Sequence, residues 1–151
     1  MTVHFLVKNL LNSTKRTFQD VFGSNYQLIE YNNSQYTETF DASPYENIFV
    51  HDSVFINISS NSCGGAIYCS RNIYRLLIEQ TTFISCTTSD IHGGGIYLSS
   101  AESGECILLR VCAYSCSSVN STKSEGQFAY FSTNNKFECK NHVNDSSVTS
   151  I

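Results

Sequence analysis

Residues 48–70 read IFVHDSVFINISSNSCGGAIYCS, and residues 76–100 read LLIEQTTFISCTTSDIHGGGIYLSS. Each stretch holds an apolar segment, a phenylalanine, a turn rich in Ser and Thr, and then Gly-Gly-x-Ile-Tyr. A third, more divergent copy spans residues 106–132, where the added residues all fall in one turn. Self-similarity with insertions confined to one turn is typical of a solenoid, in which each repeat stacks on its neighbours.

The three copies align on a small set of positions. These repeat-defining residues are Phe55, Asn57, Gly64, Gly65, Tyr68, Phe83, Cys86, Gly93, Gly94, Tyr97, Cys116, Gly126 and Tyr130. Because like positions of stacked repeats lie over one another, we expect Phe55 to lie over Phe83. For the same reason we expect Val50, Ile78 and Leu108 to form a second column.

Apolar residues within each copy recur two positions apart, as at Ile48 and Val50 or at Leu76 and Ile78. This spacing is the period of a β-strand, and β-branched and aromatic residues fill these segments. Ser, Asn and Gly between them suit sharp turns. The sequence therefore predicts an all-β fold, a parallel β-helix of about three recognisable coils stacked about 4.8 Å apart.

The two ends of the chain do not carry the repeat. Residues 1–47 combine a weak helical pattern over 1–22 with irregular sequence, and we expect an N-terminal cap followed by an irregular first coil. Residues 48–132 hold the three repeats, and residues 133–151 begin a further coil that stops early. We therefore expect a monomer or a piece of a longer solenoid.

Charge is sparse and slightly acidic. Nine Lys and Arg stand against 13 Asp and Glu, the net charge is −4, and charged residues make up 15% of the chain. Nucleic acid and anionic membranes attract basic patches, so neither is an expected partner. The sequence holds no apolar run of about 18 residues, so we expect no membrane span, and no pattern predicts a cofactor.

The repeats resemble a known family. The segments at Phe55-Ile56-Asn57 and Phe83-Ile84-Ser85-Cys86, followed by Gly-Gly-Ala-Ile-Tyr (64–68) and Gly-Gly-Gly-Ile-Tyr (93–97), are similar to the FxxN and GGA[ILVY] repeats of polymorphic membrane proteins. Those proteins are surface autotransporter adhesins of chlamydiae. The FxNC…GGAIY repeats of surface proteins in trichomonad-type protists are closer still.

The resemblance covers residues 48–132 and implies a right-handed, pectin-lyase-like β-helix at the cell surface. Three features depart from the family pattern. Asn57 lies two residues after Phe55, and the third copy has Ala113 in place of Phe and Gln127 in place of Gly. The sequence also holds no recognisable membrane anchor or autotransporter barrel.

The predicted function is a non-catalytic, adhesin-like module whose variable polar turns bind glycans or proteins of a host or neighbouring cell. The connecting turn lengthens from SSNSC to TTSDIH to SSVNSTKSE while the strands keep their pattern. One alternative is a polysaccharide lyase or glycoside hydrolase on the same fold. A second is an intracellular structural scaffold, which fully reduced cysteines would favour.

The sequence gives weak support to catalysis. His92-Gly93-Gly94-Gly95 mimics the oxyanion loop of lipases, but no GxSxG nucleophile motif accompanies it. Carbohydrate-cleaving enzymes need carboxylates that converge on one groove. The repeat alignment forms one column of Asp52, Gln80 and Arg110 and a second column of His51, Glu79 and Leu109, which we interpret as a solvated polar stripe.

The seven cysteines have three interpretations. Cys86 and Cys116 align with Ile58, which favours packing in the core, our preferred interpretation. Cys63 and Cys69 flank the GGAIY strand and can form a disulfide in an oxidising compartment. A metal site is the third interpretation, built from Cys112-x-x-x-Cys116 and Cys139-x-x-His142.

Tyr68, Tyr97 and Tyr130 align in a column of their own. An outward column would be a stripe for contact with carbohydrate or protein, and an inward one would be core with its hydroxyls at the rim. Alternation does not decide between the two faces, and the core position is the favoured hypothesis.

Overall fold

The computed structural model describes residues 15–23, 27–43, 46–70, 73–100, 104–119, 127–133 and 141–149. Their strands form four parallel sheets, in each of which neighbouring strands come from successive coils. Sheet A contains β1 (Ile29–Asn32), β4 (Asn47–His51), β8 (Arg75–Glu79), β12 (Glu105–Leu109) and β16 (Asn141–Asn144). Sheet B contains β2 (Gln35–Tyr36), β5 (Val54–Ile56), β9 (Thr82–Ile84), β13 (Cys112–Tyr114) and β17 (Ser147–Thr149).

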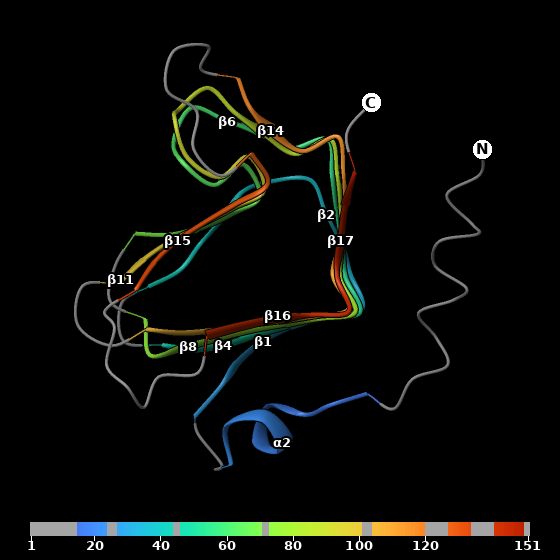
Figure 1. The fold of residues 1–151 in the computed structure, drawn as a ribbon, viewed down its shortest axis with the longest axis vertical. Coiled ribbons are helices and arrows are strands. Elements are labelled where there is room, and N and C mark those ends of the chain that lie inside the picture. Colours follow the sequence, from blue (N-terminus) through green and yellow to red (C-terminus); the bar gives the residue numbers. More distant parts are fainter. Residues whose placement is uncertain are drawn as a thin grey trace.

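Two further sheets complete the coils. Sheet D contains β6 (Ser59–Ser60), β10 (Thr87–Thr88) and β14 (Ser117–Ser118). Sheet C contains β3 (Phe40–Asp41), β7 (Ile67–Cys69), β11 (Ile96–Ser100) and β15 (Ala129–Thr133). The chain passes from sheet A through B and D to C, and then returns to A one coil further along. Figure 1 shows the strands of each sheet superposed in a view along this stack. The fold is a parallel β-helix, as the sequence predicts.

Single residues in the left-handed conformation turn the chain at the corners. The corner from sheet A to sheet B is made by Asn33, Asp52, Gln80, Arg110 and Asp145, all with φ between 47° and 54°. The corner from B to D is made in the same way by Asn57, Ser85 and Ser115. Asn and Asp adopt this conformation more readily than most non-glycine residues, which accounts for Asn57 as a repeat-defining position.

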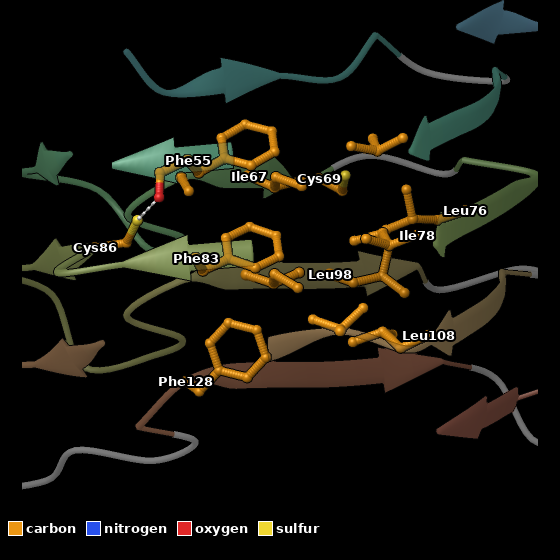
Figure 2. Packing of buried hydrophobic residues seen from close by; sticks show 14 of the residues in the cluster. Phe55, Ile67, Cys69, Leu76, Ile78, Phe83, Cys86, Leu98, Leu108 and Phe128 are labelled. Atoms are coloured by element: carbon orange, nitrogen blue, oxygen red, sulfur yellow. Dashed lines mark hydrogen bonds between the residues drawn. The ribbon is translucent and has the colours of Figure 1, made fainter. Parts of the chain in front are cut away.

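The interior is filled by ladders of like residues, as the repeat alignment predicts. Val50 pairs with Ile78 and Ile78 with Leu108 on adjacent strands, and all three side chains are buried. Phe55 and Phe83 lie one above the other (Figure 2). The third coil has Ala113 over Phe83, and the ring of Phe128 packs against Phe83 at a centroid distance of 5.2 Å. The small alanine is thus accommodated by an aromatic ring from a different part of its own coil.

The predicted N-terminal cap falls largely outside the described residues, since nothing before Lys15 is described. What is described is the short helix α2 (Phe18–Phe22), which lies against the outer face of sheet A (Figure 1). Thr17 caps its N-terminus in a capping box with Asp20, and Gly23 ends it in the left-handed conformation. Its apolar side packs into a second, outer core formed by Phe18, Phe22, Phe49, Leu77, Ile107 and Leu109.

Residues 29–41 form a more regular coil than expected. Their strands β1, β2 and β3 pair in parallel with β4, β5 and β7. At the other end, β16 and β17 pair with β12 and β13. Within the described ranges, no helix is long and apolar enough to cross a membrane.

Candidate functional site

A cluster of charged side chains lies where α2 meets the corner between sheets A and B. Its members are Lys15, Glu30, His51, Asp52, Glu79 and Arg110. The backbone N–H of Arg16 also reaches this cluster. The register of sheet A places His51 directly beside Glu79 on adjacent strands. Their alternating neighbours Val50 and Ile78 point into the interior, so His51 and Glu79 point outward.

His51 is held between two carboxylates. Its Nδ1 lies 2.7 Å from Oδ2 of Asp52, and its Nε2 lies 2.5 Å from Oε1 of Glu30. Only 4% of the His51 surface is exposed, and Asp52 also forms an ion pair with Lys15. Both ring nitrogens of His51 therefore have partners, and His51 links β1 to the corner that follows β4.

Glu79 is fully buried at the centre of the cluster. Its Oε1 accepts a hydrogen bond of 2.7 Å from the backbone N–H of Arg16 and forms an ion pair with Arg110. A buried carboxylate is tolerated when it is paired and hydrogen-bonded in this way. Glu79 therefore connects the segment before α2 to the third repeat.

The contacts within the cluster lower the pKa values of Asp52 and Glu30, which are more exposed than Glu79. Burial acts to raise the pKa of Asp52, but hydrogen bonds from Lys15 and His51 outweigh it, and the pKa is lowered. The hydrogen bond from His51, followed by that from Asn32, lowers the pKa of Glu30. Both groups are therefore held in the charged form by partners from this chain.

The interpretation as a solvated stripe is wrong for the second column. His51, Glu79 and Leu109 are buried where residues 15–22 cross sheet A. Asp52, Gln80 and Arg110 of the first column are corner residues and are partly exposed. Repeat alignment missed Lys15, Arg16 and Glu30, because they lie outside the repeats. The sequence signal for a segment packed on the repeats was the basic pair Lys15 and Arg16, which lies just before the apolar Phe18 and Phe22.

A second candidate surface lies on the outer face of sheet C. Tyr68, Tyr97 and Tyr130 pair in register there, between inward residues such as Ile67 and Cys69 that are completely buried. Successive rings are stacked with centroids 5.5 Å apart and interplanar angles of 18° and 8°. The favoured core position for these tyrosines is therefore wrong, since they face outward and are half-buried.

His92 extends this tyrosine ladder from the turn before β11. Its ring stacks on Tyr130 with a centroid distance of 4.2 Å and lies 6.1 Å from Tyr97. Ser99 and Ser132 pair in register on the same outer face. Burial raises the pKa of Tyr97 above the ordinary value of 10.0, so its hydroxyl is neutral near pH 7. The resulting surface consists of aromatic rings and neutral hydrogen-bonding groups.

The predicted glycine pairs allow the turns beneath this ladder to stack closely. Gly64 and Gly93 adopt φ values of 70° and 61°, and Gly126 lies outside the described residues. A methyl group added to Gly65 would overlap the carbonyl oxygens of Gly94 and Thr87. One added to Gly94 would overlap the backbone of Ser117. These glycines are required because successive turns touch through their backbones.

The positions of the cysteines support packing in the core rather than a disulfide between Cys63 and Cys69. Cys86 and Cys116 are buried in the column that begins with Ile58, and the Cys86 thiol donates a hydrogen bond to the Phe55 carbonyl (Figure 2). Cys63 lies beside Asp90, whereas Cys69 is buried inside sheet C, and both are free thiols. Burial raises the pKa of Cys69 to about 12.

Of the predicted metal ligands, Cys139 lies outside the described residues. Elsewhere in the part of the chain that the structure describes, no group of three or more His, Cys, Asp or Glu side chains is placed to hold a metal ion. A shallow pocket of about 410 Å³ lies between α2 and sheet A. It is lined by Arg16, Asp20, Val21, Ile107, Leu109, Asn141 and His142.

One comparison with known proteins gives a match. Residues 52–70 match the Chlamydia polymorphic membrane protein repeat, and they contain β5, β6 and β7 with the residues Phe55, Gly64, Gly65 and Tyr68. No curated protein and no solved structure matches the chain. The chain thus carries a repeat like that of the polymorphic membrane proteins, and in this structure the repeat forms most of one coil.

Proposed function

We propose that this chain is a non-catalytic, adhesin-like module of the cell surface that binds glycans or proteins through its variable turns. The observation that carries the proposal is the position of the turns between sheets D and C. The turns before β7 and β11 lead directly into strands of the outward tyrosine ladder, and His92 of the second turn stacks on Tyr130. In these two coils the variable turn and the ladder therefore form one surface.

The composition of this surface suits recognition. Tyrosine provides rigid contact area at low entropic cost, and Ser and His provide adaptable hydrogen bonds. Strands packed into a continuous core hold these groups in place, so the turns can vary without loss of the fold. The family match agrees with this assignment, because polymorphic membrane proteins are surface proteins.

The charged cluster supports the non-catalytic part of the proposal. Glycoside cleavage needs a carboxyl group that can donate a proton and a second that can act on the sugar or on water. In this cluster the carboxylates of Asp52 and Glu30 both contact the ring of His51. Oε1 of Glu79 pairs with Arg110 and accepts a hydrogen bond from the Arg16 backbone. The cluster thus holds α2 against the sheet.

The resemblance to repeats of protist surface proteins also favours an adhesive role.

Binding to a panel of immobilised glycans and to intact cells tests the proposal. We expect the wild-type chain to bind. A chain with residues 119–125 replaced by a Ser/Gly segment, or with Tyr97→Ser, should bind at least tenfold more weakly. Tyr114→Ser is the matched control, because Tyr114 is 41% exposed but lies on sheet B. Cleavage of a uronic-acid polymer that Asp52→Asn abolishes would overturn the proposal in favour of a lyase.

A further inference from the structure

Cys86 and Cys116 occupy the same position of adjacent coils. They directly precede β10 and β14, which pair in parallel with Thr87 opposite Ser117. The backbone N–H of Ser117 donates to the carbonyl of Cys86 at 3.0 Å. Among the cysteines that the structure describes, these are the two that share one ladder position.

The two side chains lie inside the fold. Cys86 is 0% exposed and Cys116 is 6% exposed, and both belong to the same core cluster. Adjacent strands lie about 4.8 Å apart, within the range of about 4.4–6.8 Å that a disulfide requires between its Cα atoms. The Cβ atoms of a disulfide lie about 3.8 Å apart, so the Cα–Cβ bonds of Cys86 and Cys116 must tilt toward each other by roughly 1 Å at the Cβ atoms, while the backbone bonds between β10 and β14 keep their length.

Sheet D can make this adjustment. Its strands β10 and β14 are two residues long, and β14 is the last strand of the sheet in the described part of the chain. No described strand pairs with β14 on its other side, so a local rotation of the backbone at Cys116 breaks no ladder on that side.

We propose that Cys86 and Cys116 form a disulfide between successive coils when the chain folds in the presence of a small-molecule disulfide such as oxidised glutathione. The bond joins the second repeat to the third between neighbouring positions of one interior column. This proposal is independent of what the tyrosine ladder binds.

The exchange takes place in two steps while the chain folds. The thiolate of Cys116, which is the more exposed of the two cysteines, attacks one sulfur of oxidised glutathione, and one glutathione leaves as its thiolate. Cys86 then loses its proton, and its sulfur attacks that of Cys116 and releases the second glutathione. Two protein thiols are oxidised, and one glutathione disulfide is reduced to two thiols.

Refolding of the full chain from denaturant in a glutathione redox buffer tests the proposal. After free thiols are alkylated, trypsin leaves Cys86 on the peptide 76–110 with Cys106, and Cys116 on the peptide 111–123 with Cys112. We expect these peptides to be recovered as one linked species without reductant. The linked chain should melt about 5–10 °C higher than the reduced one, since the bond closes a loop of about 30 residues.

Matched variants assign the linkage. Cys106→Ala and Cys112→Ser should retain the linked species, and Cys86→Ala and Cys116→Ala should each abolish it. Because a buried substitution can impair folding, the same assignment is made on the wild-type chain from fragment masses of the linked peptides. Complete alkylation of Cys86 and Cys116 after refolding in oxidised glutathione, or a link from either to another cysteine, would overturn the proposal.

Discussion

The ring of Phe83 lies flat on the ring of Phe55, with centroids 4.9 Å apart and planes 7° from parallel. Near-parallel rings with centroids about 4.5–7 Å apart are one of the arrangements that aromatic pairs favour. Here the register of β5 and β9 places the two residues directly opposite each other, so equivalent side chains must stack. The stack shows that the repeat alignment corresponds to physical columns along the axis of the β-helix.

Phe83→Ala should destabilise the chain strongly. Phe83 is fully buried between Phe55 and Phe128, so its loss leaves a cavity that the ladders cannot fill. We expect the free energy of unfolding to fall by about 3–5 kcal/mol, measured by urea denaturation. Tyr114→Ala on the exposed face of β13 should change it by less than about 0.5 kcal/mol. Equal losses for the two variants would contradict the ladder assignment.

Gly65→Ala should be more destabilising than Gly23→Ala. The added methyl group at Gly65 meets the backbone of the next coil, which cannot move without separating the coils. At Gly23 nothing lies within 4 Å of an added methyl group, and only the φ of 79° opposes it. We expect a loss of about 3 kcal/mol at Gly65 and about 1–2 kcal/mol at Gly23, measured as changes in unfolding free energy. The reverse order would show that successive turns are not in backbone contact.

Arg110→Gln should leave the carboxylate of Glu79 buried without its cation. We expect a loss of about 3–5 kcal/mol in unfolding free energy, as for other buried pairs that lose one partner. Gln80 occupies the equivalent corner with a φ of 47°, so glutamine suits the backbone conformation at this position. The double variant Glu79→Gln/Arg110→Gln removes the uncompensated charge and should recover part of the loss. No recovery in the double variant would indicate that the pair is not coupled.

Acid should weaken the attachment of α2 through Asp52 and Glu30. Their folded-state pKa values lie below the unfolded ones, so their stabilisation is complete above about pH 4–5 and is lost as the pH falls through the folded values. Asp52→Asn should be less stable than wild type at pH 7 and should lose less stability between pH 7 and pH 3. Urea midpoints at both pH values measure this difference.

Lys15→Ala provides the second arm of the acid experiment. It leaves the Asp52 carboxylate in place but removes the cation that helps to lower its pKa. This variant should therefore also show a shallower loss of stability on acidification. If both variants follow the wild-type pH dependence in parallel, the acid sensitivity of the chain has another source.

The sequence by itself determined the coils and the inner ladders. Apolar residues two apart, a repeated phenylalanine and paired glycines predicted parallel coils, and Val50, Ile78 and Leu108 stack as expected. These features are predictable because a β-helix repeats its local environment. A residue in one coil therefore meets its own equivalent in the next, and alignment of the repeats is equivalent to a contact map.

The tertiary structure alone decided what covers the coils. The outward direction of Tyr68 and Tyr97 depends on how β7 and β11 enter from their turns, which period-two alternation does not specify. The burial of His51 and Glu79 depends on Lys15 and Arg16, which lie outside the repeats and meet sheet A only when α2 packs on Phe49 and Leu77. Contacts between a repeat and a segment that does not repeat have no periodic signal, because each such contact occurs once.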